Sequence, residues 1–504
     1  MKNLNFTTVT SIFFLIFLSI ALQGQEPDQN LGKFREAECP FPLPEGVILG
    51  ENFTFGYVTM PELHSQPNGR TIELAVAIFP STSEEHAPDP LVMNTAGPGK
   101  SNMDNFIPQI AGGLGAYILP QRDIVIIELR GLRYSTPFLS LDEVREAKLS
   151  VMDQNLSPSE TMAVLKKALL ASRERFEGEG VNLSAYNNIE TAADIAVIME
   201  NLGYEKFNMA GSSAGTMVAQ HVIRDYPDRV RCGILDAGLP LDQSIILNYV
   251  PSIVNCLKNY FEECRNTPDC NEAFPNLEER FLGLLESLNQ NPVMLDLTDP
   301  VSGQAFSYAM NGYRLAENVF LQTFYSTQIP FLIGQLLNGD YSTLINQLNY
   351  SLIPNYFADG LGLTIFTTES GSYSLSDIDY DPVYQIFNEG VSMSGMGAEY
   401  FLEVNKIFNL SKLDPERIQY PEPRDVPVIV LNGIYDPVIP EKYDVVMKED
   451  LNNCYIYRFD GVPHSAFDNA TQCVLPMFLQ FINDPSKAPD SSCMENYKQV
   501  YRVE

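Results

Sequence analysis

Short apolar runs alternate with segments of helical periodicity along much of this chain, and the alternation restricts the folds it can adopt. Thr191–Leu202 and Thr216–Tyr226 place apolar residues on one face of a helix. Strands separated by helices pair in parallel and carry the helices on both faces of the sheet. The sequence therefore predicts an α/β fold with a mostly parallel sheet. Its expected strands are Thr71–Phe79, Pro90–Asn94, Asp123–Glu128, Phe207–Ala210, Gly233–Asp236, Pro427–Asn432 and Cys454–Phe459.

The alternation is interrupted after Leu239 and resumes at Val426. The intervening segment is rich in Phe, Tyr, Leu, Asn and Gln and has mainly helical patterns, which is typical of a cap domain inserted into a sheet. A chain of 504 residues is also too long for one compact core. We expect a signal peptide at 1–24, the α/β core at 25–240 and 425–504, and a mainly helical cap at 241–424.

The first residues have the pattern of an export signal. Lys2 supplies a positive charge, the apolar run Ser11–Leu22 follows it, and the small and polar residues Gln23–Gln25 come next. The apolar run is too short to span a bilayer comfortably, so a cleaved secretory signal is favoured over a membrane anchor. We therefore expect a secreted or periplasmic protein that keeps no stable membrane anchor.

The charge balance narrows the range of partners. The chain has 64 acidic residues against 32 basic ones, which gives a formal net charge of −32. Such a surface repels phosphate backbones, so nucleic-acid binding is excluded from the expected functions. The composition leaves the oligomeric state open.

Eight cysteines are consistent with an oxidising compartment. Cys264 and Cys270 flank a turn-like segment and could close a local disulfide. Cys473 and Cys493 could tie the last helix to the C-terminal tail. We expect no metal site, because the chain has no CxxC pair and no cluster of His and Cys. Two cysteines in strand-like segments are candidates for buried thiols: Cys232 and Cys454.

The segment Gly211–Gly215 matches the pattern G-x-S-x-G. The pattern alone is weak, but here an expected strand leads into it and an amphipathic helix leads out. This is the arrangement of a nucleophile elbow, which presents a serine hydroxyl at the carboxyl end of a sheet. A Cβ at either glycine would collide with the neighbouring strand or helix. Ser213 is therefore the candidate nucleophile.

A serine hydroxyl needs a base to take its proton, and the chain has four histidines. His464 follows an expected strand, in a loop that can reach over the sheet edge to Ser213. His64 and His86 lie in polar loops near the N-terminus. His221 is on the elbow's own helix, about two turns past the serine, and would point elsewhere. His464 is therefore the candidate base.

An acid must orient the imidazole of that base. Asp436 follows the apolar strand Pro427–Asn432, and the order Ser…Asp…His is the chain order of the α/β-hydrolase fold. Asp460 is a rival that lies too close along the chain to His464 to orient its ring easily. Asp236, which ends the strand after the elbow, is a second rival. The sequence thus predicts an α/β-hydrolase fold with Asp436 as the third member of the triad.

Acyl transfer also needs hydrogen-bond donors aimed at the oxyanion that forms on the substrate. One candidate is the backbone N–H of Ala214, which follows the serine at a helix N-terminus. The second should come from the glycine-containing loop Asn94–Gly99, which follows an earlier strand. Gly97 is the candidate donor there, because Pro98 has no N–H to give.

Together these motifs resemble those of the prolyl-aminopeptidase and tripeptidyl-aminopeptidase family of α/β-hydrolases, over about Phe53–Cys493. Thr95–Gly99 is similar to that family's oxyanion loop, and Glu128–Ser135 is similar to its D-x-R-G-x-G-x-S segment. The loops that carry Asp436 and His464 resemble its aspartate and histidine loops. Four positions depart from the family's usual residues: Ala96, Glu128, Ala214 and Pro463.

The resemblance implies a serine hydrolase that cleaves peptide bonds near a free N-terminus through an acyl-enzyme, without a metal or organic cofactor. It also implies that cap carboxylates bind the α-ammonium of the substrate, for which Glu399 is the candidate. Two alternatives stay open. One is a carboxylesterase or lipase-like hydrolase with the same machinery, and the other is a catalytically silent binding protein on the same scaffold. Either enzyme would take a peptide or a small acyl substrate.

Overall fold

The computed structural model describes residues 30–352, 357–371, 373–392 and 397–503. Within them a nine-stranded sheet has the order β1-β2-β3-β5-β4-β6-β7-β10-β11. In this order, β5, β4, β6, β7, β10 and β11 are parallel to one another, whereas β1, β2 and β3 are antiparallel to their neighbours. The strands are β1 (Phe34–Glu36), β2 (Thr54–Pro61), β3 (Thr71–Phe79), β4 (Leu91–Asn94), β5 (Ile124–Ile127), β6 (Phe207–Ser212), β7 (Val230–Asp236), β10 (Val428–Gly433) and β11 (Cys454–Phe459).

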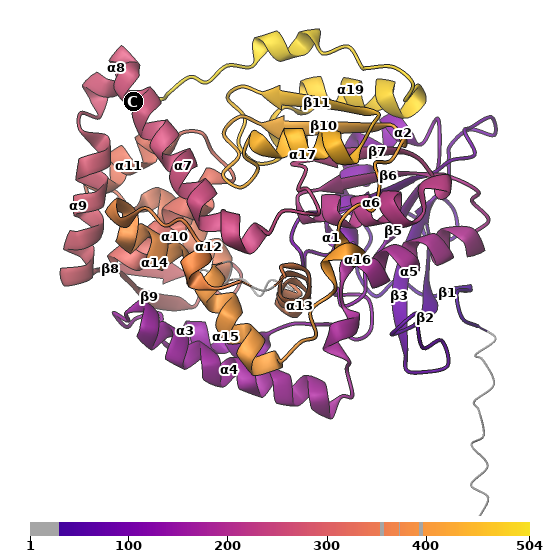
Figure 1. Cartoon of the computed structure of the whole chain (residues 1–504), viewed down its shortest axis with the longest axis horizontal. Coiled ribbons are helices and arrows are strands. Elements are labelled where there is room, and N and C mark those ends of the chain that lie inside the picture. The colour runs from indigo at the N-terminus through magenta and orange to yellow at the C-terminus, as the bar shows by residue number, and fades with distance from the viewer. Residues whose placement is uncertain (1–29, 353–356, 372, 393–396, 504) are drawn as a thin grey trace, which may run out of the picture.

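Helices cover both faces of this sheet, as expected (Figure 1). Successive residues of a strand point to opposite faces, and β3 shows this directly. Its Leu74 and Val76 belong to the same buried cluster as α5 (Asn188–Asn201) and α6 (Ala214–Asp225). The alternate residues of β3 pack with the helices of the opposite face, α1 (Asn102–Gln109) and α19 (Thr471–Asn483). The mostly parallel sheet with helices on both faces is therefore confirmed.

A largely helical segment lies between β7 and β10 and also contains a two-stranded sheet. In Figure 1 its helices form a layer beside the sheet, and α3 and α4 lie in that layer although they precede the elbow in sequence. Arg173 of α4 donates to the Ile407 carbonyl of α15, and Lys166 pairs with Glu403. The division of the chain at residues 241 and 424 stays a prediction. The layer contains α3 (Asp142–Ser150), α4 (Pro158–Gly178), α7 (Ile245–Asn266), α8 (Pro268–Ala273), α9 (Leu277–Gln290), β8 (Val293–Thr298), β9 (Ala305–Met310), α10 (Gly312–Thr323), α11 (Ile329–Leu337), α12 (Ser342–Leu352), α13 (Asp359–Glu369), α14 (Gln385–Ser392) and α15 (Ala398–Phe408).

Both expected disulfides are present. Cys264–Cys270 joins α7 to α8, and Cys473–Cys493 ties α19 to the C-terminal tail. Cys232 is a buried free thiol, as expected, whereas Cys454 is a free thiol that is only half-buried. The expected signal peptide at 1–24 lies outside the described residues. Along the part of the chain that is described, no helix combines the length and apolar character needed to cross a bilayer.

Candidate active site

Ser213 occupies the tight turn between β6 and α6. Its φ of 52° lies in the left-handed region, which a non-glycine residue rarely adopts. Such strained backbone gathers at functional sites, where surrounding structure holds it in place. The Ser213 N–H donates to the Asp236 carbonyl of neighbouring β7 at 2.8 Å. The sheet therefore fixes the backbone of the turn and leaves the hydroxyl at the carboxyl end of the strands.

The two glycines of the elbow are required by close packing, as the sequence predicts. A Cβ on Gly211 would lie 2.2 Å from the Gly215 carbonyl oxygen, and a Cβ on Gly215 would lie 2.6 Å from the Asn94 carbonyl oxygen. Both distances are shorter than real carbon atoms allow. Gly215 thus lets α6 lie directly against the end of β4, where the candidate oxyanion loop begins.

The imidazole of His464 and the carboxylate of Asp436 form a direct hydrogen bond. His464 Nδ1 lies 2.7 Å from Asp436 Oδ2. The other oxygen of Asp436 accepts from the backbone N–H groups of Val438 and Ile439, at 2.9 and 3.0 Å. These two donors fix the plane of the carboxylate, and the carboxylate in turn fixes the ring. The imidazole packs nearly perpendicular to the ring of Phe324, with the two centroids 5.0 Å apart.

The surroundings of His464 favour its protonated form. Burial works to lower the pKa of His464. The carboxylate of Asp436, with smaller contributions from Asp236 and Asp468, outweighs burial and holds that pKa above its usual value. A base with a raised pKa accepts a proton readily and is stabilised once it becomes an imidazolium.

Asp236, the rival acid, contacts the neighbours of both Ser213 and His464 and not the ring itself. Its Oδ2 accepts from Ser212 Oγ at 3.1 Å and from Ser465 Oγ at 2.6 Å. Its Oδ1 accepts from the backbone N–H of the next residue after Ser465, at 2.7 Å. Burial raises the pKa of Asp236 to about 6. The residues that flank the candidate nucleophile and base thus meet on one carboxylate.

Among the described residues, the Ser213 hydroxyl makes no hydrogen bond. In enzymes without substrate the bond between nucleophile and base is often long, and it tightens when substrate binds. The strand order places Ser213 and His464 at the same edge of the sheet, separated by the ends of β7 and β10.

The candidate oxyanion donors also lie at this edge. The N–H groups of Gly97 and Ala214 donate to no other residue in the described ranges. Gly97 has a φ of 149°, and a Cβ there would lie 2.6 Å from the Gly99 nitrogen. Asn102 holds the loop by accepting from the Thr95 N–H at 2.8 Å. Two N–H groups without an acceptor in the described residues, at the sheet edge that carries Ser213, are what a developing oxyanion requires.

The remaining histidines have other surroundings. His64 Nε2 lies 2.8 Å from Asp194 Oδ1, and His86 bonds to the Ser83 carbonyl. His221 is fully buried in α6, and neither ring nitrogen has a hydrogen-bond partner within the described structure. None of these rings lies at the carboxyl edge of the sheet beside the elbow.

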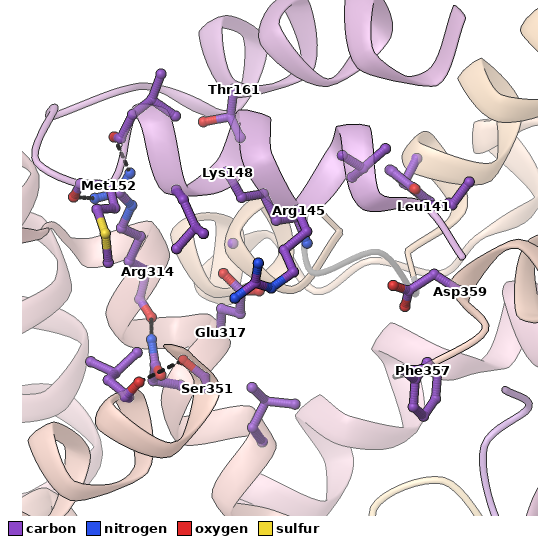
Figure 2. A pocket seen from close by; sticks show the side chains of 18 of the residues that line it. Leu141, Arg145, Lys148, Met152, Thr161, Arg314, Glu317, Ser351, Phe357 and Asp359 are labelled. Carbon is purple, nitrogen blue, oxygen red and sulfur yellow. Dashed lines mark hydrogen bonds between the residues drawn. The ribbon is translucent and has the colours of Figure 1, made fainter. Parts of the chain in front are cut away.

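A cavity of about 540 Å³ opens beside the candidate oxyanion loop and is lined there by Gly97 and Pro98. Its other walls come from helices of the layer beside the sheet, and two carboxylates, Glu317 and Asp359, face it (Figure 2). Burial raises the pKa of both carboxyl groups. Glu399 does not line the cavity, so its assignment to the substrate ammonium stays a prediction.

Sequence reasoning did not anticipate that α3 forms a wall of this cavity. Arg145 and Lys148 of that helix face the cavity together with Leu141. The helix lies outside the segment expected to form the cap, and its sequence is a charged amphipathic pattern typical of solvent-exposed helices. Nothing in the local sequence distinguishes such a helix from a surface one.

Comparison with known proteins agrees with this geometry. Residues 89–271 match the family model of the α/β-hydrolase fold. Serine protease Hip1 of Mycobacterium tuberculosis is 25% identical over 252 residues, which are 47% of this chain and 45% of the relative. Tripeptidyl aminopeptidase of Streptomyces lividans is 30% identical over 186 residues, 36% of this chain and 34% of the relative. The matches thus span less than half the length of these curated relatives.

Solved structures with low sequence identity also match. A thermophilic esterase from Thermogutta terrifontis covers 86% of this chain and 99% of its own, with a TM-score of 0.39 and 12% identity. The chain has the α/β-hydrolase fold, as its mostly parallel sheet, its elbow and the match of residues 89–271 show. Over part of its length it is similar in sequence to serine protease Hip1 and to tripeptidyl aminopeptidase, in agreement with the resemblance found in its motifs.

Proposed function

We propose that this chain is an exported serine hydrolase that cleaves peptide bonds near a free N-terminus. Ser213 attacks the substrate carbonyl while His464 Nε2 takes the hydroxyl proton, and Asp436 holds the proton on Nδ1. The N–H groups of Gly97 and Ala214 stabilise the oxyanion. His464 then protonates the leaving amine, and water releases the acyl group by the same steps.

One observation carries this proposal: the 2.7 Å bond between His464 and Asp436, at the sheet edge where the strained elbow presents Ser213. The two disulfides support export, since disulfides persist in oxidising compartments.

The cavity supports a peptidase that recognises a free N-terminus. It begins at the candidate oxyanion loop, so the acyl part of a substrate bound at Ser213 would extend into it. Glu317 and Asp359 face the same space and would pair with a substrate ammonium. Desolvation in the cavity disfavours the ionised form of both carboxyl groups, and an ammonium beside them would offset that cost. The names of the related proteins, a serine protease and a tripeptidyl aminopeptidase, agree with this class of substrate.

The nucleophile is tested by a fluorophosphonate probe on the purified protein. Ser213→Ala should abolish labelling and lower kcat by roughly five to six orders of magnitude, because the acyl-enzyme cannot form. Ser212→Ala is the matched control, since it removes the adjacent hydroxyl and should remain labelled. Labelling of Ser213→Ala at the wild-type level would contradict the assignment, and an unlabelled wild-type protein would favour a silent scaffold.

The substrate class is tested with three matched compounds: a peptide amide with a free N-terminus, its N-acetylated copy and a short acyl ester. We expect cleavage of the free peptide and a large loss for the acetylated one, because acetylation removes the ammonium that Glu317 and Asp359 would bind. Ester cleavage without any cleavage of the free peptide would identify a carboxylesterase instead.

A further inference from the structure

Two cationic side chains extend from one face of α3 into the cavity (Figure 2). Arg145 and Lys148 are three residues apart, a spacing that places side chains next to each other on a helix. The cavity therefore has a pair of neighbouring cations on one wall. This pair is unusual in a chain with twice as many acidic as basic residues.

The cationic side chains that line the cavity differ in how many hydrogen bonds they already donate to the protein. Arg314 donates to the carbonyl oxygens of Val151, Met152 and Ala309, at 2.6 to 3.0 Å. Arg145 donates to a single carbonyl, that of Leu352 at the end of α12. The ammonium of Lys148 forms no hydrogen bond and no ion pair within the described residues. Donors on α3 thus remain available to a ligand.

Lys148 lies within electrostatic reach of the two carboxylates without contacting either. Its positive charge lowers the pKa of Glu317 and of Asp359, although burial outweighs it at both groups. The described lining of the cavity therefore contains three cations and two carboxylates. A ligand that brings only an ammonium would add to the excess of positive charge in this cluster, whereas an additional carboxylate on the ligand would offset the charge of that ammonium.

We propose that Lys148 and Arg145 form a subsite for a carboxylate side chain in the acyl part of the substrate. The preferred substrates are then peptides that carry Asp or Glu in the residues on the N-terminal side of the cleaved bond. The inference rests on the proposed peptidase function and adds the substrate's charge to it. Such a peptide carries a positive ammonium and a negative side-chain carboxylate. The cavity has carboxylates that can pair with the first and cations that can pair with the second.

The test compares two fluorogenic peptide amides with free N-termini that differ only by Glu or Gln in the acyl part. Glu and Gln have nearly the same shape, so the ratio of their kcat/KM values reports the charge. We expect the wild-type protein to favour Glu by about tenfold, since hydrogen bonds between charged groups are stronger than neutral ones. Lys148→Met should reduce this ratio severalfold, and Lys148→Glu should favour a Lys-containing peptide instead.

Lys167→Met is the matched control, because Lys167 is an exposed lysine on α4 that does not line the cavity. It should leave the Glu/Gln ratio unchanged. The affinity of Ser213→Ala for both peptides, measured by calorimetry, provides a readout that needs no substitution in α3. Cleavage of both peptides at equal rates, with equal affinities, would overturn this inference and leave the proposed function standing. Failure to cleave any free peptide would overturn both.

Discussion

Replacing Asp436 with Asn tests the candidate triad at the point where the structure is most specific. Asp436 Oδ1 accepts from the backbone N–H groups of Val438 and Ile439, which only an oxygen can do. The amide introduced by Asp436→Asn must therefore place its oxygen there and its NH₂ beside His464 Nδ1, where the carboxylate oxygen now lies at 2.7 Å. An NH₂ group donates, so it forces Nδ1 to accept and moves the ring proton to Nε2. That tautomer cannot take the proton of Ser213.

The expected loss in kcat is about 10⁴-fold, the magnitude found when an acid that orients a catalytic histidine becomes an amide. Stability should change little, because the two backbone donors keep their acceptor. The assay is steady-state hydrolysis of a peptide amide, with thermal unfolding as the check on folding. Asp236→Asn is the matched control: it neutralises another nearby buried carboxylate, which does not contact the ring, and should cost no more than about tenfold in kcat/KM because His464 keeps its tautomer.

A loss below about tenfold in Asp436→Asn would refute this account of the site, because a protein that tolerates the wrong tautomer does not use His464 as its base. A loss of about 10⁴-fold in Asp236→Asn, with little effect of Asp436→Asn, would move the orienting role to Asp236.

Three further predictions concern pH and packing. The pKa of His464 lies above its usual value, so the base is neutral only at higher pH, and kcat/KM should fall as pH drops through a value above about 6.5 in a pH–rate profile. Gly215→Ala should lower both the melting temperature and probe labelling, because its Cβ would overlap the start of the oxyanion loop. Cys473→Ser with Cys493→Ser opens a loop with a sequence separation of 20 and should cost about 3 kcal/mol in denaturant unfolding. A kcat/KM that stays constant as pH falls, an unchanged melting temperature in Gly215→Ala, or an unchanged unfolding midpoint in the double cysteine variant would contradict the respective prediction.

Much of the core could be predicted from the sequence because its signals are local. Apolar runs bounded by polar or turn residues gave all seven expected strands, and two of them, Thr71–Phe79 and Cys454–Phe459, have the expected bounds. The pattern G-x-S-x-G between a strand and a helix located the elbow, and strand ends located the loops of Asp436 and His464. In a parallel sheet the carboxyl ends of the strands share one edge, so sequence order was enough to bring these loops together.

The cavity could not be predicted, because it depends on packing between distant segments. The α3 and α4 helices precede the elbow, yet α4 packs against α15 near the end of the layer beside the sheet, and α3 packs against α4. Their amphipathic patterns show which face is buried but not which element covers it. Strand β1 was missed because its three residues are mostly exposed at the sheet edge and include a single apolar side chain, that of Phe34, which is too few to show an alternating pattern.

Asp236 shows how a residue can hold a site together while lying outside its chemistry. Burial raises the pKa of its carboxyl to about 6, so the ionised form is disfavoured by burial at neutral pH. The raised pKa also means that this group stabilises the fold at low pH and loses that contribution as pH rises through about 6. A neutral residue would avoid this cost, but the carboxylate accepts from the neighbour of Ser213 with one oxygen and from the loop of His464 with both. At this cost in stability, the carboxylate of Asp236 fixes the elbow and the loop of His464 relative to each other. The two loops lie far apart along the chain: Ser465, in the second of them, is 229 residues from Asp236.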